Sequence, residues 1–203
     1  VKSVNRWLGP DQLRTPYRLK HRPLLDGDKV RRALEEGGDV AGRLNDYVDR
    51  TELLFEDLQS ETVLTHRDIG FGVGQVLPVL VSASALRGHL IAVEQPELHL
   101  HPAQQAELGD VFIASALGSQ RNTFLLETHS EHLILRIMRR IRETHAGTLP
   151  KGATPVTKKD VSILFVERDG ARCIVREMPL NERGELVKAW PGGFFEEGFN
   201  EMF

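Results

Sequence analysis

The sequence predicts an α/β fold with a largely parallel sheet, flanking helices and antiparallel hairpin additions. Two apolar segments, residues 89–94 and 123–127, have the composition and length of strands that are buried on both faces. Each is followed by a segment with helical spacing, and strands that alternate with helices in this way form parallel sheets. Hairpin signals occur before and after this middle region. We therefore expect a parallel centre with antiparallel strands towards both ends of the chain.

The N-terminal third is expected to hold a connection, two short helices and a hairpin. Residues 1–27 contain three prolines among scattered basic residues, which predicts an irregular segment or an edge connection. Helical spacing predicts short surface helices over residues 28–36 and 39–48. Alternating apolar and polar residues over 52–57 and 62–66 predict a hairpin.

Proline and glycine mark the limits of two helices in the middle of the chain. Residues 76–86 are apolar enough for a buried helix, with Pro78 in the first turn, where its missing amide is tolerated. A second helix is expected over residues 102–117, because Pro102 stands at its start and Gly118 follows its end.

The C-terminal third is expected to hold a helix, a loop and a second hairpin. The helix covers residues 131–145, and Ser130 is suited to cap it. Residues 147–159 are polar and rich in glycine, proline and threonine, which predicts a loop. A hairpin is expected over residues 161–178, because Asp169-Gly170 is a strong turn signal.

Composition excludes several classes of protein. A chain of 203 residues with a formal net charge of −3 gives no global electrostatic argument for binding nucleic acid or membranes. Cys173 is the single cysteine, so the chain has neither an internal disulfide nor a C-x-x-C pair for structural zinc. No apolar run approaches the roughly 20 residues that cross a bilayer. We expect a cytoplasmic protein without a membrane segment.

Polar side chains follow both apolar strands at the point where each strand ends. Glu94, Gln95 and Glu97 come after the first strand, and Thr128 and His129 come after the second. The carboxyl ends of parallel strands meet at one edge of the sheet, so these side chains are expected to lie close together. Acids there can hold magnesium or orient water, and a histidine can reach a terminal phosphate. This layout is typical of a nucleoside-triphosphatase core.

These segments carry a family resemblance. Residues 90–95 resemble a Walker B strand, 98–102 resemble the D-loop, and His129 resembles the switch histidine. Residues 68–78 resemble a degenerate ABC signature, and 190–195 resemble the small C-terminal domain of one uncharacterised subgroup. The chain is thus similar to the C-terminal half of an ABC-class ATPase, from the prokaryotic AAA/SMC-like branch that includes repair ATPases, OLD-type ATPases and several phage-defence ATPases.

The resemblance covers roughly residues 50–203 and implies a P-loop NTPase-type fold. We expect three parts. Residues 1–50 form an N-terminal irregular or helical connection, and residues 51–147 form the C-terminal lobe of the ATPase. Residues 148–203 hold the loop, the second hairpin and the small C-terminal domain.

The resemblance implies a role for each residue at the strand ends. Glu94 stands where the family holds magnesium through its water shell, and His129 would contact the γ-phosphate. Gln95 occupies the position of the catalytic glutamate; an amide can orient water but cannot accept a proton. Hydrolysis would then depend on Glu97, on substrate-assisted proton transfer, or be slow. Simple polar residues at a strand end remain the alternative.

The resemblance implies that two further sets of residues bind nucleotide across a dimer. His99 and His101 belong to the D-loop, which crosses to a partner subunit; a metal site and ordinary loop packing are the alternatives. A zinc site at His129 lacks an evident third ligand nearby. The residues that resemble the ABC signature, here called the signature set, would present backbone amides at a helix N-terminus to the phosphate held by the opposite subunit. The alternative is a plain glycine-rich turn. The members of the signature set are Gly70, Gly72, Gly74 and Gln75.

The predicted helix after His129 carries a basic stripe. A charge run of this kind is expected to be a solvated face, and contact with nucleic acid is the alternative. The stripe consists of Arg136, Arg139, Arg140 and Arg142. The aromatic segment 190–195 is expected to pack back onto the domain.

Together these interpretations predict an ATPase that forms a head-to-tail homodimer around two ATP–Mg²⁺ units. The chain contains no G-x-x-x-x-G-K-[ST] loop and opens with valine, so we expect it to be part of a longer protein. On its own it should neither bind ATP tightly nor hydrolyse it. The alternative is an ATP-gated clamp or sensor that hydrolyses weakly and recruits a nuclease or toxin partner in DNA repair or phage defence.

Overall fold

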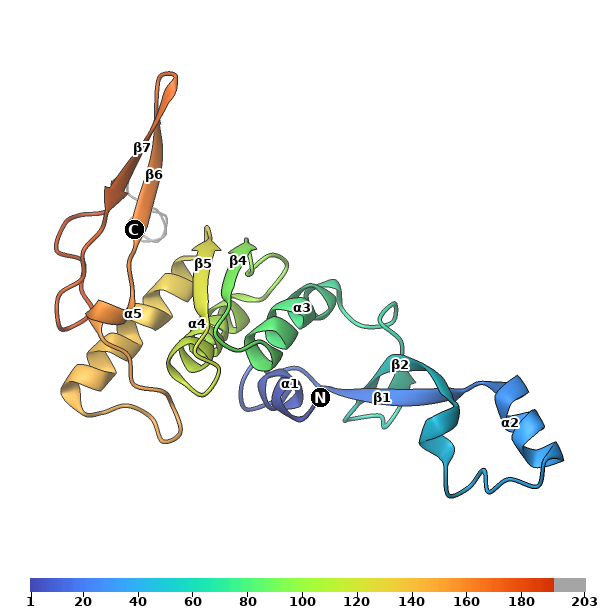
Figure 1. The fold of residues 1–203 in the computed structure, drawn as a ribbon. Coiled ribbons are helices and arrows are strands. Elements are labelled where there is room, and N and C mark those ends of the chain that lie inside the picture. Colours follow the sequence, from blue (N-terminus) through green and yellow to red (C-terminus); the bar gives the residue numbers. More distant parts are fainter. Residues whose placement is uncertain (192–203) are drawn as a thin grey trace. The chain divides into compact units, whose positions relative to one another are not determined.

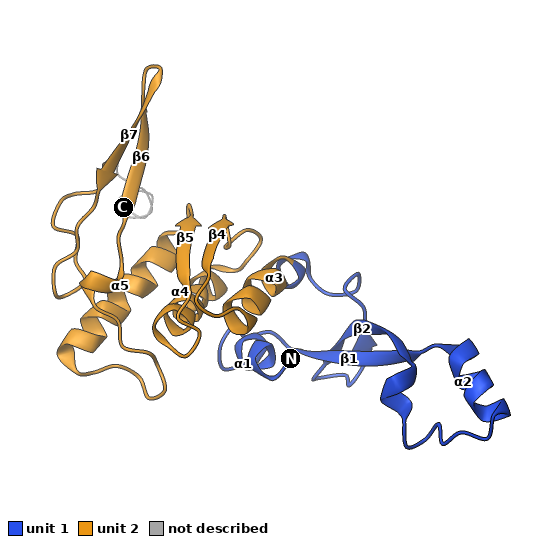
Figure 2. Ribbon diagram, in the orientation of Figure 1, with its two compact units in different colours: residues 1–74 blue, residues 75–203 orange. Residues whose placement is uncertain are grey.

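The structure is a computed structural model that describes residues 1–191 (Figure 1). The chain divides into two compact units, residues 1–74 and residues 75–203 (Figure 2). The division predicted at residues 50 and 147 stays a prediction.

The first unit is a three-stranded antiparallel sheet with short helices. Its strands pair in the order β1-β2-β3, so the hairpin predicted over residues 52–66 is confirmed and gains a third strand. The elements are α1 (Lys2–Leu8), β1 (Tyr17–Leu25), α2 (Gly27–Glu35), the 3-10 helix η1 (Leu44–Tyr47), β2 (Val48–Asp57) and β3 (Val63–Leu64).

Of the two alternatives predicted for residues 1–27, the irregular segment is wrong, because α1 and β1 lie there. The Asn5 side chain accepts a hydrogen bond from the Leu19 amide (2.7 Å) and donates one to the Leu19 carbonyl (2.9 Å), which fastens α1 to β1. Leu8 and Leu19 are buried beside this link. Pro23 lies in β1, and β1 is an edge strand, where a missing amide is tolerated.

The second surface helix, predicted over residues 39–48, is also wrong. Only the four residues of η1 are helical there, and β2 begins at Val48. The Asp39 side chain accepts a hydrogen bond from the Gly42 amide at 2.9 Å. Such a local bond competes with helix formation, which explains the short turn.

The second unit contains the predicted alternation of strands and helices. The helix α3 spans the division between the units. The elements are α3 (Phe71–Ala85), β4 (Leu90–Glu94), α4 (Pro102–Leu117), β5 (Thr123–Glu127), α5 (Glu131–Ala146), the 3-10 helix η2 (Lys158–Asp160), β6 (Leu164–Asp169) and β7 (Arg172–Glu177). Because α3 begins at Phe71, Pro78 lies inside the helix, and its predicted place in the first turn is wrong.

The strands β4 and β5 form a parallel pair, in register from Leu90 opposite Thr123 to Glu94 opposite Glu127. One face of this pair packs against α4, where the rings of Phe112 and Phe124 meet edge to face at 5.0 Å. Residues on the other face are exposed, so the expectation that both faces are buried is wrong for the part of the chain described. The side chain of Leu90, for example, lies on the exposed face.

The helix α5 anchors the C-terminal segment. A buried cluster joins α4 and α5 to residues 156–180; its members are Ile113, Ile134, Met138, Ile141, Val156 and Leu180. Trp190 packs against this cluster, and its ring meets that of Phe165 at 5.6 Å. The docking predicted for the aromatic segment therefore holds at Trp190, while residues 192–195 lie outside the described residues. The predicted turn is present too, with Gly170 at a φ of 60° between β6 and β7.

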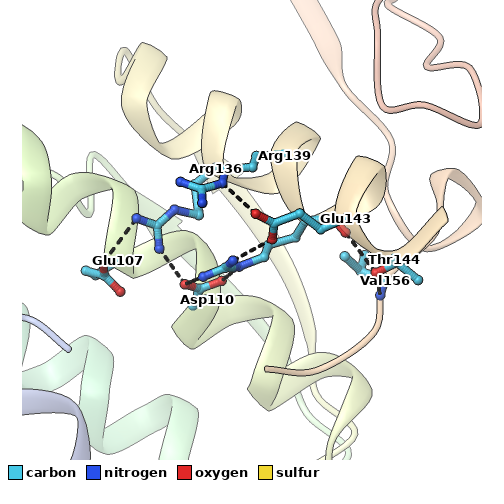
Figure 3. A network of polar contacts seen from close by, with 8 residues as sticks. Glu107, Asp110, Arg136, Arg139, Glu143, Thr144 and Val156 are labelled. Carbon is cyan, nitrogen blue, oxygen red and sulfur yellow. Dashed lines mark hydrogen bonds and ion pairs between the residues drawn. The ribbon is translucent and has the colours of Figure 1, made fainter. Parts of the chain in front are cut away.

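A network of buried ion pairs also joins α4 to α5 (Figure 3). Arg136 contacts Asp110 at 2.5 Å and Glu107 at 3.1 Å. Arg140 donates to both oxygens of Asp110, at 2.7 and 2.8 Å, and to Glu143 at 2.6 Å. The side chains of Arg136 and Arg140 are only 13% and 11% exposed. The solvated face predicted for the basic stripe is thus wrong for these two arginines.

The network predicts a pH-dependent stability. Burial alone would raise the pKa of Glu143, but hydrogen bonds from Arg140 and Arg139 outweigh it and hold the pKa below the usual 4.5. A carboxyl whose folded pKa is depressed stabilises the fold above its unfolded pKa and loses that contribution as pH falls through the folded value. Glu143→Gln should therefore lower the free energy of unfolding at about pH 7 and have a smaller effect at about pH 3, which lies below the usual pKa of 4.5. Urea unfolding at both pH values checks this; an equal effect at both would contradict it.

Candidate functional site

Three charged or titratable side chains meet where β4 and β5 end. Glu94 and Glu127 are register partners at the last positions of the two strands. His129 lies two residues further on, and its Nε2 is 3.3 Å from Oε1 of Glu127. All three side chains are exposed and continue the alternation of the open sheet face. We call Glu94, Glu127 and His129 the strand-end site; it brings the predicted residues Glu94 and His129 to one edge of the sheet.

The loop between β4 and α4, residues 95–101, has an unusual backbone. Gln95 and His99 have φ values of 46° and 61°, in the left-handed region that non-glycine residues seldom adopt. The Gln95 amide donates to the Glu127 carbonyl at 2.8 Å, which extends the strand pairing by one residue. Strain of this kind costs on the order of 1 kcal/mol per residue and accumulates at functional sites. Both side chains are exposed.

Glu97 behaves differently from its neighbours in this loop. Its side chain is turned inward, and the residue is 8% exposed. Oε1 accepts a hydrogen bond from the His129 amide at 2.8 Å. Oε2 is buried too and has no hydrogen-bond partner among the described residues. The structure therefore brings Glu97 to the backbone of His129 and not to the open face.

The first turns of α4 and α5 are capped and linked. Nδ1 of His101 accepts from the Ala103 amide at 3.3 Å, which places any ring proton of neutral His101 on Nε2. Ser130 confirms its predicted role, since its Oγ accepts from the Leu133 amide at 3.1 Å. The same hydroxyl donates to Gln105 at 2.7 Å. These bonds hold the N-terminal ends of the two helices beside the strand-end site.

The glycines predicted to bind phosphate belong to the start of α3 and are not members of the strand-end site. Gly72 and Gly74 lie within the helix, and Gly70 precedes it. None of the three has a positive φ. A Cβ added at Gly70 or Gly74 would meet no atom within 4 Å. The fold itself does not require glycine at these two positions, so binding by Gly70, Gly72, Gly74 and Gln75 stays a prediction.

Sequence reasoning missed two residues. Glu127 was assigned no role, although its position as the last strand residue before His129 could have indicated one. Gln105 joins the two loops, because it accepts from Ser130 and donates to the Leu100 carbonyl at 3.0 Å. No local signal identifies this link, since the contact between Gln105 and Ser130 depends on how α4 meets the loop before α5.

Residues 1–191 contain no group of three or more histidine, cysteine, aspartate or glutamate side chains placed to hold a metal ion. The alternative metal sites at His99, His101 and His129 thus lack a third ligand within that range.

A groove between α3 and the two strands, lined in part by Pro78, Ile91 and Phe124, has no charged lining and is no phosphate site. Within the same residues, no helix combines the length and apolar character that crossing a bilayer requires.

Two family models match the chain. One, described as "AAA domain, putative AbiEii toxin, Type IV TA system", matches residues 2–136. The other, described as "Protein of unknown function (DUF3696)", matches residues 156–203. No curated protein matches the chain. Among solved structures, one from work on "ATP-driven dimerization and DNA stimulated activation of SMC ATPases" is similar, with a TM-score of 0.48 and 10% sequence identity; the alignment covers 87% of this chain and 83% of that chain.

Proposed function

The chain belongs to the AAA-domain family whose model matches residues 2–136, and from this premise we propose that it supplies the Walker B, D-loop and switch segments of an ABC-class ATPase. The observation that carries the proposal is the strand-end site, where Glu94 and Glu127 end two parallel strands and His129 lies beside them. An acid and a histidine at one sheet edge are the groups that a triphosphate and its metal require.

The charge of the strand-end site favours Mg²⁺ as the cofactor. Two carboxylates at one edge repel a triphosphate unless a cation lies between them. Mg²⁺ needs no cage of protein ligands, because it is held by one or two carboxylates together with water and phosphate oxygens. Glu94 would hold the ion through its water shell. The exposed amide of Gln95 would orient the attacking water, and His129 would donate a hydrogen bond to the terminal phosphate.

Two parts of the ATPase are proposed to come from outside the strand-end site. The phosphate-binding loop is proposed to lie in sequence other than residues 1–203, since these contain no G-x-x-x-x-G-K-[ST]. The signature segment around Gly72 and the exposed D-loop residue His99 are proposed to face a second copy in a head-to-tail homodimer. Support for the signature comes from Gly70 and Gly74, where the fold gives no reason for glycine.

A nucleic-acid partner has less support. Arg136 and Arg140 of the basic stripe are engaged in the buried network, and Arg139 pairs with Glu143 at 2.7 Å. Of the stripe, Arg139 and Arg142 are exposed.

ATP turnover tests the proposal. The full-length protein should hydrolyse ATP in the presence of Mg²⁺, whereas isolated residues 1–203 should neither bind ATP tightly nor turn it over. The measurement is phosphate release together with equilibrium binding of labelled ATP. Absence of both binding and turnover in the full-length protein would reject an ATPase, and turnover by the isolated chain at micromolar concentration would reject the missing phosphate loop.

Gln95 favours a second candidate, the weakly hydrolysing clamp that recruits an effector. An amide cannot accept the proton of the attacking water, so turnover should be slow. If the protein is a clamp, Gln95→Glu should raise kcat by about tenfold or more, because a carboxylate can serve as the base. ATP should drive dimerisation of the wild type, as measured by light scattering. A fast wild type whose kcat falls in Gln95→Glu would contradict the clamp and support the efficient enzyme.

A further inference from the structure

We propose that Glu97 is a positioning residue, which holds the switch histidine through its backbone, and not the group that accepts a proton during hydrolysis. The proposal rests on the ATPase function proposed above. It replaces the catalytic role expected for Glu97 from the sequence.

The first argument is the contact that Glu97 makes. Strand pairing ends with the bond from the Gln95 amide to the Glu127 carbonyl. Two residues further along each segment, the Glu97 carboxylate accepts from the His129 amide at 2.8 Å. A charge-assisted bond of this kind is stronger than one between neutral groups. Glu97 thus extends the pairing with a side chain and keeps His129 beside the loop that follows β4.

The second argument is access. A general base must come within hydrogen-bond distance of the proton that it removes, directly or through one water. Glu97 is 8% exposed, Oε1 is occupied by the His129 amide, and Oε2 is buried. The side chains of Gln95 and His129, in contrast, are exposed. The carboxylate of Glu97 is therefore closed to the water that Gln95 can reach.

A second link acts in parallel and supports the same role. Ser130, next to His129, donates to Gln105, and Gln105 donates to the Leu100 carbonyl in the loop that contains Glu97. Both links join the same two loops. The position of the His129 ring consequently follows the conformation of residues 95–101.

Two substitutions at one position separate the two roles. Glu97→Gln keeps an oxygen that can accept from the His129 amide but cannot take up a proton. Glu97→Ala removes the acceptor altogether. In the full-length protein we expect Glu97→Gln to keep kcat within about threefold of the wild type and Glu97→Ala to lower it by about tenfold or more. The exposed Glu177 provides the matched control, and Glu177→Gln should leave kcat unchanged.

Hydrogen exchange at the His129 amide provides a readout that does not depend on turnover. Exchange should accelerate in Glu97→Ala and stay as slow as in the wild type in Glu97→Gln. A loss of activity in Glu97→Gln as large as in Glu97→Ala, with the amide still protected, would overturn the proposal and make Glu97 the base. Unchanged exchange in Glu97→Ala would overturn it as well.

Failure of the proposed function is distinguishable from failure of this inference. If the wild type neither binds nor hydrolyses ATP, the ATPase proposal fails, and amide exchange alone decides whether Glu97 positions His129. If Glu97→Ala does not fold, Glu97→Gln still decides between the two roles through kcat.

Discussion

Replacing Asp110 with alanine is expected to lower the free energy of unfolding of the second unit by about 3 kcal/mol, because removal of one partner leaves buried charge without compensation. Asp110 accepts three hydrogen bonds, one from Arg136 and two from Arg140. Its side chain is 14% exposed, so water cannot replace these bonds easily. Arg140 depends most on Asp110, whose hydrogen bond raises the pKa of the guanidinium against the opposing effect of burial.

Arg139→Ala is the matched control for Asp110→Ala. Arg139 lies on α5, beside Arg140, and pairs with Glu143, but its side chain is 59% exposed, and exposed pairs contribute little. Its removal should leave the free energy of unfolding unchanged within error. Trp190 packs on the α5 cluster and reports unfolding of this unit by fluorescence once Trp7 has been replaced by phenylalanine. Equal, small effects of Asp110→Ala and Arg139→Ala would show that the network does not stabilise the fold.

The second large effect concerns catalysis. His129→Ala is expected to lower kcat of the full-length protein by about 100-fold, as removal of one preorganised donor to a developing phosphate charge does. The substitution removes the imidazole but keeps the amide that Glu97 accepts from, so the loops should stay linked. Steady-state phosphate release checks the rate, and hydrogen exchange at residue 129 checks the link.

His132→Ala is the control for the histidine. His132 is exposed in the first turn of α5, and its replacement should leave kcat unchanged. A loss in His132→Ala as large as in His129→Ala would show that the effect is not specific to His129. An unchanged rate in His129→Ala would remove His129 from the reaction.

Local sequence patterns were sufficient to predict the helices and strands in the middle of the chain. The helix predicted over residues 102–117 agrees with α4, and the strand predicted over 123–127 agrees with β5. Caps and proline or glycine punctuation act over three or four residues, so a single sequence contains the whole signal. The parallel order of the strands then placed Glu94 and His129 at one edge.

Longer-range contacts account for the errors. Prolines in residues 1–27 predicted an irregular segment, yet the bonds from Asn5 to Leu19 and the edge position of β1 allow a regular helix and strand. In the same way, the apolar composition of residues 89–94 predicted that Leu90 is buried. Its burial requires a second layer of structure over the open face of the sheet, which the described residues do not supply.

The sequence by itself determined the α/β, P-loop NTPase-type fold, which the parallel β4–β5 pair and the match to the AAA-domain family confirm. Only the tertiary structure decided that Arg140 meets Asp110 and that Glu97 turns inward onto the His129 amide. These partners are 30 and 32 residues apart in the chain. Periodicity shows which residues share a helix face or follow a strand, but what such a face meets depends on the packing of segments that are distant in sequence.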